Sequence, residues 1–466
     1  MELTGKRVLV LGLGESGLAC ALWCGRQGAR VTVADTRPAP PFLGELRRRL
    51  ASAEFRAARF DEQCDKRLLD GVDLLVLSPG LSPGLMIVLH ARAQGIPVVG
   101  EIELFAQGLR ALKQHVPVLA ITGTNGKTTT TALTGHLIAA SGRSVGVAGN
   151  ISPAALTALM DWLDRGALPQ AWVLELSSFQ LETTATLNAA AATVLNISDD
   201  HLDRYIDLDD YASAKARVFQ AQEGYAGAQV LNRQDARVKH MAIPGRRILT
   251  FGLDAPVDEN DFGLRQNRGE AWLVQGDRFL LPVSELPIAG LHNAANAMAA
   301  LALCAAVGID PVGLLPALRA FRGLPHRVEK VAAVDGVDYF DDSKGTNVGA
   351  TVAALQGLGR KSVVILGGDG KGQDFSPLQA AVACHARAAV LIGRDAPLIG
   401  AAIAGCGVPV DSAADMDAAV RRAAALAQPG DAVLLSPACA SFDMFRNYEH
   451  RADVFRAAVA ALGDGK

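Results

Sequence analysis

The chain lacks an excess of charge of either sign. Its 45 lysine and arginine residues are interspersed with 48 aspartate and glutamate residues, and the formal net charge is −3. A strong basic field is what draws nucleic acid or anionic lipid to a protein surface. Neither partner is expected here, and small molecules are the favoured ligands.

Long apolar runs and a secretion signal are also missing. Residues 297–309 form an apolar stretch, but a bilayer span needs about 20 such residues. Residues 1–14 have neither the basic segment nor the cleavage site of a signal peptide. We therefore expect no membrane insertion, a cytoplasmic location and a monomer.

Cysteine is scarce, and its spacing does not suggest a disulfide framework. Seven cysteines are scattered over 466 residues. Cys20 and Cys24 lie four residues apart on an expected helix, where packing as small apolar side chains is a simpler interpretation than metal binding. We expect free thiols.

What the sequence does contain is enough apolar material for several cores. Hydrophobic residues make up 50% of the chain, and its length suits about three domains. Three stretches show apolar strands alternating with helical segments, which is typical of parallel α/β layers. We predict an α/β fold with a Rossmann-like domain (1–109), a central P-loop ATPase-like domain (110–323) and a second Rossmann-like domain (324–466). Residues 248–286, with short runs rich in Gly and Asp, predict a small antiparallel part within the central domain.

The strand predictions follow short apolar runs bounded by turn residues. The expected strands are residues 7–11, 30–34, 118–121, 172–176, 193–197, 337–340, 362–366, 389–392 and 432–435. A helix is expected after the turn 12–17, up to residue 27, and another over 128–140.

The string ITGTNGKTTT at residues 121–130 is the most informative motif. A glycine turn between a buried strand and a helix directs backbone N–H groups and the helix N-terminus toward an anion. Lys127 adds a point charge, and the Thr128 hydroxyl is a ligand for Mg²⁺. The motif predicts binding of a nucleoside triphosphate. It is not a full Walker A motif, because Ile121 stands where that pattern has its first glycine.

A second glycine turn, GLGESG at residues 12–17, follows the first strand, and Asp35 ends the next one. The spacing matches the dinucleotide-binding fingerprint. Its physical basis is capture of a diphosphate on a helix N-terminus, which suits any nucleotide diphosphate. A redox cofactor, a nucleotide-sugar and a turn without ligand all remain open.

Acidic residues follow two further strands near the phosphate loop. Glu175 closes one strand, and NISDDHLDRY places His201 among three aspartates after another. Carboxylates and histidine in such positions can hold Mg²⁺ or its water. Lys215 follows in a helical segment. The alternatives are a solvated acid at Glu175 and a solvated helix lysine at Lys215.

Taken in order, these and other segments resemble the Mur ligase family over essentially the whole chain. The segments are GTNGKTTTT, GNIS, ELSSFQLE, NISDDHLDRY, YASAKARVF, GLHNAANAMAA, FRGLPHR, DDSKGTN, GGDGKGQDF and SPACASFDMF. GTNGKT and HNAAN are shared with the wider family, which includes folylpolyglutamate synthases. GLGESG, DTR, SPG and SPACASFDMF resemble its glutamate-adding members.

The resemblance implies an ATP- and Mg²⁺-dependent ligase of peptidoglycan precursor synthesis. Such an enzyme phosphorylates the L-alanine carboxylate of UDP-N-acetylmuramoyl-L-alanine, and the amine of D-glutamate then attacks the acyl phosphate. The first domain is implied to bind the UDP-substrate, the second ATP and the third D-glutamate. A hinge near Gly323 is expected to let the third domain close.

The resemblance also implies residue roles. ATP is assigned to Gly123, Thr124, Asn125, Gly126, Lys127, Thr128, Thr129, Asn293, Asn296, Arg327, Asp342 and Lys344. The UDP-substrate is assigned to Ser16, Asp35, Thr36, Arg37, Gly80, Asn150 and His201, and D-glutamate to Thr346, Lys371, Ser441 and Tyr448. Metal binding is assigned to Thr128, Glu175, His201 and Lys215, the last as a carbamate. The implied catalytic residues are Lys127, His201, Lys215 and Lys344.

Several of these roles have simpler alternatives. Asn293 can cap its helix, and Asp342 and Lys344 can form a salt-bridged loop. Tyr448 replaces the phenylalanine of some relatives, and the Glu15 side chain would face the diphosphate.

Two other function classes remain to be weighed. A nicotinamide dehydrogenase would explain GLGESG and Asp35 but not the phosphate loop. A P-loop switch or motor would explain the phosphate loop but not the third α/β domain.

Overall fold

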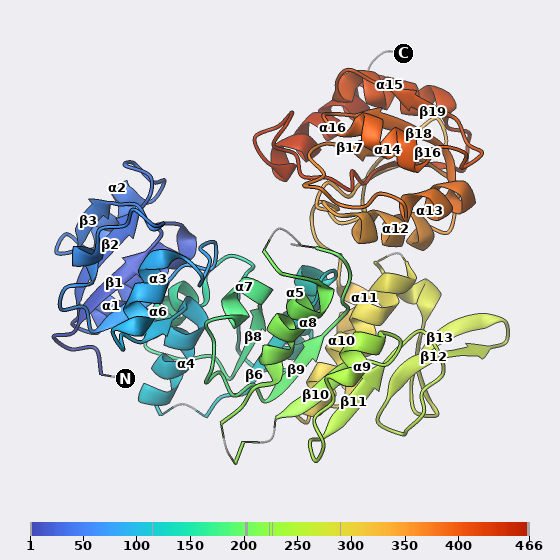
Figure 1. Cartoon of the computed structure of the whole chain (residues 1–466). Coiled ribbons are helices and arrows are strands. Elements are labelled where there is room, and N and C mark those ends of the chain that lie inside the picture. Colours follow the sequence, from blue (N-terminus) through green and yellow to red (C-terminus); the bar gives the residue numbers. More distant parts are fainter. Residues whose placement is uncertain are drawn as a thin grey trace.

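The computed structural model describes residues 2–113, 115–200, 204–222, 224–225, 227–288 and 290–463. His201, which the sequence assigned to the UDP-substrate, to a metal and to catalysis, lies outside the described residues. The chain forms three β-sheets in succession, each with helices packed around it (Figure 1). The α/β fold class with three domains is confirmed.

The first sheet has the order β3-β2-β1-β4-β5, and all its pairs are parallel. Its strands are β1 (Arg7–Leu11), β2 (Arg30–Asp35), β3 (Glu54–Ala57), β4 (Leu74–Leu77) and β5 (Val98–Val99). Its helices are α1 (Glu15–Arg26), α2 (Leu43–Arg49) and α3 (Met86–Ala93), and α4 (Glu101–Ala111) leads to the second sheet. Parallel pairing places the turns after β1, β2 and β4 at one edge of the sheet.

The second sheet has the order β14-β13-β12-β11-β10-β9-β6-β8-β7. Its strands are β6 (Val118–Thr122), β7 (Val145–Gly149), β8 (Ala171–Glu175), β9 (Ala191–Val194), β10 (Ala228–Asn232), β11 (Ile248–Phe251), β12 (Phe262–Asn267), β13 (Glu270–Gln275) and β14 (Arg278–Pro282). Its helices are α5 (Lys127–Ala140), α6 (Ala155–Asp164), α7 (Ser178–Leu181), α8 (Leu208–Ala216), α9 (Ala236–His240), α10 (Leu291–Ala306) and α11 (Leu315–Ala320). Strands β12, β13 and β14 pair antiparallel, which confirms the expected antiparallel part.

The third sheet has the order β15-β16-β20-β17-β18-β19 and is parallel except for the first pair. Its strands are β15 (Glu329–Val334), β16 (Val337–Asp341), β17 (Ser362–Gly367), β18 (Ala386–Ile392), β19 (Val410–Ser412) and β20 (Ala432–Leu435). Its helices are α12 (Val348–Gly357), α13 (Leu378–His385), α14 (Ala396–Ala402), α15 (Met416–Leu426) and α16 (Tyr448–Gly463).

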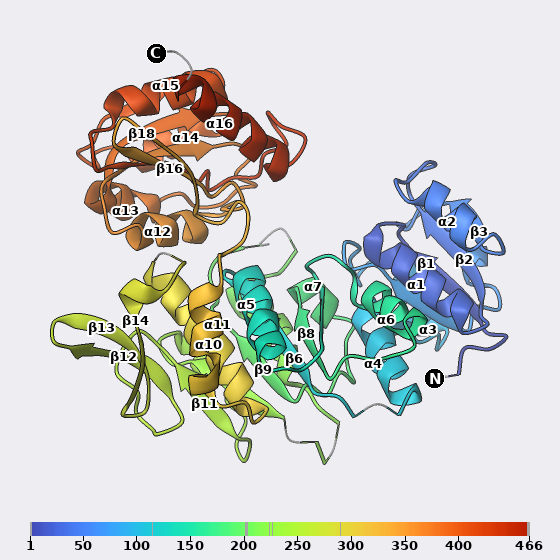
Figure 2. The same ribbon diagram turned by 180° about the vertical axis from the view of Figure 1, so that it is seen from behind.

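The central strand β6 contributes to two apolar cores because its side chains alternate between the faces of the sheet. Val118 and Ala120 belong to a cluster that also contains α1, α4 and α6. Leu119 and Ile121 belong to a cluster with α5 and α10, which lie together on the other face (Figure 2). The first of these clusters extends into the first sheet, so one apolar core joins the first two sheets.

The third sheet has apolar cores of its own. Among the described residues, its apolar clusters contain only positions from Val328 onward. It stands above the second sheet and apart from the first in Figure 1. The connecting segment contains Gly323 with φ +77°, and His326 and Val328 with φ +62° and +49°. Left-handed backbone is strained for a β-branched residue such as valine.

Most expected strands agree with the structure to within a few residues, but one end is wrong. Residues 193–197 were expected as a strand, whereas β9 ends at Val194. Asn196 leaves the strand because its side chain accepts a hydrogen bond from Asn125 N–H at 2.8 Å and donates one to the Asn125 carbonyl oxygen at 3.1 Å. The phosphate loop therefore sets the end of β9.

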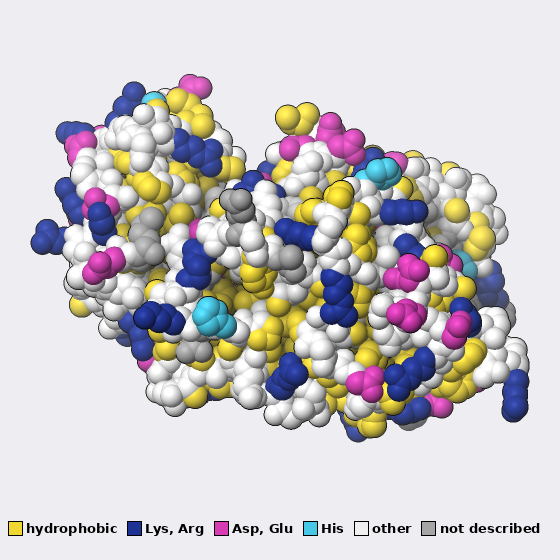
Figure 3. Space-filling model, turned by 90° about the horizontal axis from the view of Figure 1, so that it is seen from below, with side chains coloured by type: hydrophobic (Ala, Val, Ile, Leu, Met, Phe, Trp, Pro, Cys, Tyr) yellow, Lys and Arg dark blue, Asp and Glu magenta, His cyan; other side chains and the backbone are white. Residues whose placement is uncertain are grey.

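The surface agrees with the mixed charge of the sequence. Basic and acidic side chains are interspersed over the face in Figure 3, with apolar atoms between them. All seven cysteines are free, as expected. Within the described part of the chain, no helix has both the length and the apolar composition needed to cross a membrane.

Candidate active site

A cavity of about 490 Å³ lies between the second and third sheets. The phosphate loop, the end of β8 and the start of α10 line it from one side, and the segment from Arg327 to Ala354 lines it from the other. The nominated residues among its walls are Thr124, Asn125, Gly126, Lys127, Thr128, Thr129, Asn150, Glu175, Asn293, Asn296, Arg327, Asp342, Lys344 and Thr346. Side chains from distant segments thus meet around one space.

The phosphate loop is a short turn between β6 and α5. Gly123 and Gly126 have φ +148° and +83°, and Gly126 precedes the first residue of α5. Residue 121 lies within β6, so the strand occupies the position where the longer motif has its first glycine. Lys127 Nζ donates to the carbonyl oxygens of Gly123 and Thr124, both at 2.9 Å. The Lys127 ammonium therefore binds the carbonyl oxygens of the same loop whose N–H groups would bind a phosphate.

Two of the expected metal ligands line the cavity. Glu175 Oε1 accepts a hydrogen bond from Asn150 Nδ2 at 2.8 Å, whereas the buried Glu175 Oε2 has no hydrogen-bond partner. The Thr128 hydroxyl accepts a hydrogen bond from Arg327 at 2.6 Å. An unpartnered buried carboxylate oxygen is costly unless a cation or donor meets it. Glu175 and Thr128 therefore fit a hard cation such as Mg²⁺.

Lys215 lies on α8 beneath the phosphate loop and is 1% exposed. Its Nζ donates to the Gly123 carbonyl oxygen at 2.9 Å and lies 4.5 Å from the centre of the Tyr211 ring. Burial, together with the charge of Lys127, holds the pKa of Lys215 well below its usual range. The alternative of a solvated helix lysine is wrong.

Positive charge gathers on both sides of the cavity. Burial lowers the pKa of Lys127, of Arg327 and of Lys344, while Glu175 stabilises the charged form of each. Lys344 Nζ lies 3.7 Å from the centre of the Tyr448 ring. Cations held in a poorly hydrated space interact strongly with a polyanion.

Asn293 and Asn296 lie one turn apart on α10, and Asn296 Nδ2 donates to Asn293 Oδ1 at 3.1 Å. Asn293 is not the helix cap, because Gly290 occupies that position. Both amides line the cavity beside the phosphate loop. Their positions suit recognition of a polar planar group such as a base.

Asp342 is buried at the far wall. It accepts hydrogen bonds from the Ser436 hydroxyl at 2.7 Å and from Val328 N–H at 3.3 Å. Burial raises its pKa to about 7. Within the described residues, Asp342 and Lys344 form no ion pair with each other, and the Lys344 ammonium faces the Tyr448 ring instead.

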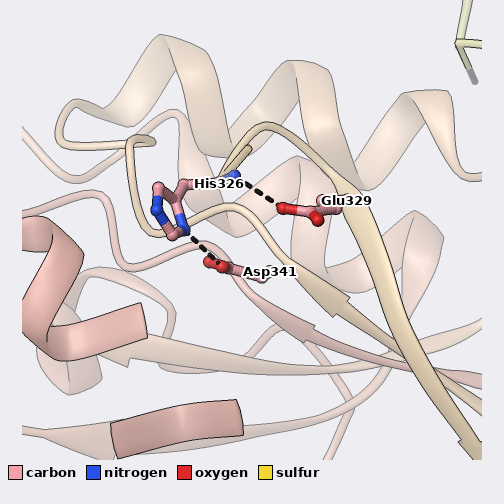
Figure 4. Close-up of side chains that lie close together, drawn as sticks. All are labelled: His326, Glu329 and Asp341. Carbon is pink, nitrogen blue, oxygen red and sulfur yellow. Dashed lines mark hydrogen bonds and ion pairs between the residues drawn. The ribbon is translucent and has the colours of Figure 1, made fainter. Parts of the chain in front are cut away.

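A second cluster, His326, Glu329 and Asp341, lies at the base of the connecting segment (Figure 4). His326 Nδ1 is 2.7 Å from Asp341 Oδ2, and His326 N–H donates to Glu329 Oε2 at 3.0 Å. Arg456 of α16 donates to Glu329 at 2.5 Å and to Asp341 at 3.2 Å. The guanidinium already neutralises both carboxylates, so the cluster fastens the segment rather than offering a metal site.

The D-glutamate nominees are only partly brought together. Thr346 lines the cavity, and the loops of Lys371 and Ser441 meet through a bridge between Asp369 and Ala440. Lys371 is exposed and has φ +51°. Tyr448 begins α16, and its hydroxyl donates to Glu449 at 3.0 Å.

The first-domain nominees lie outside the cavity, at the ends of β2 and β4 and at the start of α1. Asp35 accepts hydrogen bonds from Arg37 Nε and Nη2, both at 2.8 Å, and from Leu13 N–H at 2.7 Å. Arg37 lowers the pKa of Asp35 to about 2. Ser16 lies in the first turn of α1, Thr36 follows β2, and Gly80 is exposed after β4.

The Glu15 side chain turns away from this turn and toward the second domain. Its Oε1 accepts hydrogen bonds from the Ser152 hydroxyl at 2.9 Å and from Ala154 N–H at 3.2 Å. The sequence could not reveal this contact, because the two segments are far apart in the chain.

Two other residues of the cavity wall were missed. Asn347 caps α12 and donates from Nδ2 to Asn125 Oδ1 at 3.1 Å, which links the third domain to the phosphate loop. His292 is half-buried beside the two asparagines of α10, and removal of its ring from water lowers its pKa to about 4. Asn347 lies in the motif DDSKGTN and His292 in GLHNAAN. Their place in these motifs is the sequence feature that could have identified them as site residues.

Comparison with protein-family models gives three matches along the chain. Residues 6–100 match the Mur ligase MurD-like N-terminal domain, residues 121–304 the Mur ligase middle domain, and residues 326–439 the Mur ligase glutamate ligase domain. Together they cover most of the described structure.

Two curated relatives match nearly the full length. The UDP-N-acetylmuramoylalanine–D-glutamate ligase of Aromatoleum aromaticum is 58% identical, with 99% of this chain and 98% of that protein covered. The ligase of the same name from Ralstonia nicotianae is 56% identical over the same shares.

Solved structures share the fold at low identity. UDP-N-acetylmuramate-alanine ligase MurC from Thermotoga maritima has a TM-score of 0.59 and 20% identity, covering 99% of this chain and 100% of that one. Mycobacterium tuberculosis folylpolyglutamate synthase complexed with ADP has a TM-score of 0.53 and 19% identity, covering 78% and 94%.

Proposed function

The chain belongs to the Mur ligase family, and from that premise we propose that it uses ATP to join D-glutamate to UDP-N-acetylmuramoyl-L-alanine. This is an amide-forming step of peptidoglycan precursor synthesis. Beside the full-length relatives of that name, one observation carries the proposal. The cavity between the second and third domains gathers the phosphate loop, the acid Glu175 and the cations Lys127, Arg327 and Lys344.

The first half-reaction is phosphoryl transfer. An oxygen of the L-alanine carboxylate attacks the γ-phosphorus of ATP while the bond to the β,γ-bridging oxygen breaks, so ADP leaves and an acyl phosphate remains. The main requirement is charge stabilisation around the transferred group. Lys127 on one wall and Arg327 and Lys344 on the other supply positive charge from two sides.

Magnesium is the cation that the donor set suits. Glu175 Oε2 is buried without a hydrogen-bond partner, and the Thr128 hydroxyl lies on the same cavity. Oxygen donors of this kind are what Mg²⁺ prefers, and the ion would neutralise phosphate oxygens when bound. His201, the third expected ligand, belongs to this proposal on the family resemblance alone.

Lys215 is proposed to carry a carbamate. Its suppressed pKa leaves a fraction of neutral amine, which can add carbon dioxide with loss of one proton. The product replaces a buried cation beside Lys127 with an anionic oxygen donor. That exchange relieves the repulsion between the buried Lys215 ammonium and the half-buried Lys127 ammonium.

The second half-reaction forms the amide. The D-glutamate amine attacks the acyl carbon, and the tetrahedral intermediate expels phosphate as the amine loses its proton. Thr346, Lys371, Ser441 and Tyr448 are proposed to receive the amino acid, because two carboxylates need a cation and hydroxyl donors. Closure of the third domain would keep water from the acyl phosphate.

The first domain is proposed to hold the UDP-substrate. Backbone N–H groups at the start of α1 suit a diphosphate, and Ser16, Asp35, Thr36, Arg37 and Gly80 stand around that sheet edge. Asn150, which binds Glu175, lies nearer the reacting end. A monomer in the cytoplasm is the setting we propose.

Phosphate release tests the proposed function. With ATP, Mg²⁺ and UDP-N-acetylmuramoyl-L-alanine, we expect release with D-glutamate and at least about tenfold less with L-glutamate, L-lysine or meso-diaminopimelate. Lys127→Ala is the matched control and should release little phosphate with any of them. Absence of release with D-glutamate in the wild-type protein would refute the proposal. Saturable binding of NAD(P)H would instead favour the dehydrogenase alternative.

A further inference from the structure

Arg204 connects the first domain to the second. Its Nη1 donates to the Pro79 carbonyl oxygen and its Nη2 to the Leu81 carbonyl oxygen, both at 3.1 Å. These carbonyls flank Gly80, so the guanidinium holds the loop after β4 from both sides. The Arg204 side chain is only 13% exposed.

The arginine is itself held in place by the second domain. Nη2 also donates to Glu182 Oε2 at 2.5 Å, and the guanidinium lies 4.1 Å from the centre of the Phe179 ring. Glu182 Oε1 accepts a hydrogen bond from the Tyr205 hydroxyl at 2.7 Å. A guanidinium that already pairs with a carboxylate and stacks on a ring loses little conformational freedom when it binds further acceptors.

The loop that Arg204 holds packs on the glycine turn of the first domain. The Ser78 hydroxyl donates to the Gly12 carbonyl oxygen at 3.0 Å, and Leu81 N–H donates to the Ser78 carbonyl oxygen at 3.0 Å. A side chain at Gly12 would meet Ser78 and Leu81 within about 3.2 Å. Movement of the loop would therefore disturb the turn at the start of α1.

Within the second domain, a series of aromatic contacts connects the Arg204 guanidinium with the phosphate loop. Phe179 stacks on Tyr205 with ring centres 6.1 Å apart, and Tyr205 lies 5.3 Å from Tyr211. The Tyr211 hydroxyl is 3.4 Å from the hydroxyl oxygen of Thr124. Because closely packed rings are hardly compressible, they keep Arg204 and the phosphate loop at a fixed distance from each other.

We propose that Arg204 is a positioning residue for the UDP-substrate. It sets the loop around Gly80, and with it the diphosphate turn, at a fixed place relative to the phosphate loop of the second domain. The inference rests on the proposed function, since it assumes that the first domain holds the UDP-substrate. Arg204 itself need not touch either substrate.

Steady-state kinetics with a matched control tests the proposal. In Arg204→Met we expect the KM for UDP-N-acetylmuramoyl-L-alanine to rise by about tenfold or more, because two charge-assisted hydrogen bonds to the loop are lost. The kcat and the affinity for ADP should stay within about threefold of wild type. The KM of Arg204→Lys should fall between those of the wild-type protein and Arg204→Met, since lysine keeps the charge but lacks the two parallel N–H donors of the guanidinium.

Arg233→Met is the control, because Arg233 makes the same kinds of contact wholly within the second domain. Arg233 pairs with Asp254 at 2.7 Å and donates to the carbonyl oxygens of Phe262 and Asp254 at 2.6 and 2.8 Å. Its loss should leave the KM for the UDP-substrate within about twofold. An equal rise in both variants would overturn the proposal.

Three other outcomes would also overturn it: an unchanged KM in Arg204→Met, a matching loss of ADP affinity, or a loss confined to kcat. If Arg204→Met does not fold, Glu182→Gln replaces it and should raise the same KM by a smaller factor. An inactive wild-type protein would refute the proposed function instead, so the two failures are distinguishable.

Discussion

At the scale of single residues, Lys215 is the most unusual side chain. It is buried on α8, it donates to the Gly123 carbonyl oxygen, and it faces the Tyr211 ring. A lysine so far from water is stable only with its proton removed or its charge compensated. Its place directly under the phosphate loop is compatible with the carbamate proposed for it.

Lys215→Ala should lose at least about 100-fold in phosphate release, because the carbamate proposed to lie beneath the phosphate loop cannot then form. Acetate or formate should restore part of that activity by placing a carboxylate in the vacated space. Lys239→Ala, an exposed lysine of α9, should have full activity and no response to acetate. Full activity of Lys215→Ala would remove the carbamate from the mechanism.

Residue-scale nominations came from motifs that carry their own chemistry, and the fold brings several of them together. Lys127, Glu175, Asn296, Arg327 and Asp342 were nominated from separate motifs and line one cavity. Their roles stay predictions. The contacts of Glu15 and Asn347 could not be predicted, because their partners come from other domains.

At the scale of elements, the turn from β6 into α5 depends on glycine at residue 126. Its φ of +83° is left-handed, and a Cβ there would overlap the Asn296 amide oxygen of α10. The turn needs glycine both for its backbone and for the close approach of a neighbouring helix. The helix N-terminus and the α10 amides are thereby set against each other.

Gly126→Ala should therefore weaken ADP binding by about tenfold or more, measured by calorimetry. Gly142→Ala is its control, since Gly142 follows the same helix with φ +85° and nothing lies within 4 Å of an added Cβ. Both changes should destabilise the fold by about 1–2 kcal/mol through backbone strain. Wild-type ADP affinity in Gly126→Ala would contradict this account of the turn.

Element-scale predictions were good where an apolar run is bounded by local turn residues. β1 and β20 have the expected ends, and α5 begins one residue early. The end of β9 was missed because the amide of Asn196 binds the phosphate loop, a tertiary contact that local propensity does not contain.

At the scale of the whole molecule, the first two sheets share an apolar core, and α4 joins them. Two carboxylates of α4 bind the second domain in opposite electrostatic settings. Glu101 is fully buried and accepts a hydrogen bond from Leu156 N–H at 2.8 Å, at the start of α6. Glu103 accepts hydrogen bonds from Ala185 N–H and Thr186 N–H, both at 2.9 Å.

These settings predict opposite effects on stability. Burial raises the pKa of Glu101 from 4.5 to about 7, so its ionised form destabilises the folded state above pH 7 and protonation relieves this as the pH falls toward 4.5. Glu101→Gln should raise the apparent Tm at pH 8, with a gain of at most about 3 kcal/mol in the free energy of unfolding. This gain should shrink by pH 5.

Glu103 provides the opposite case on the same helix. Burial opposes its ionisation, but hydrogen bonds from Thr186, Gln107 and Ala185 outweigh burial and lower its pKa. Its stabilising effect is present above the unfolded pKa and is lost as the pH falls below it. Glu103→Gln should therefore lower the apparent Tm at pH 8. Equal shifts of one sign in both variants would contradict the burial argument.

The three α/β units were predictable from alternating strands and helices, whereas their arrangement was not. Which domains share a core depends on faces of α1, α4 and α6 that look like ordinary amphipathic or buried helices in the sequence. The domain limits at residues 109 and 323 stay predictions.

The attachment of the third domain has an evolutionary consequence. Within the described residues its apolar clusters are its own, and polar contacts such as Arg327 to Thr128 and Asn347 to Asn125 join it to the phosphate loop. A module attached in this way can be exchanged or diversified without repacking its neighbour. If it receives the amino acid, as proposed, new specificities can arise by recombination at this junction, provided that the incoming module keeps the cations at positions 327 and 344 that face the phosphate loop.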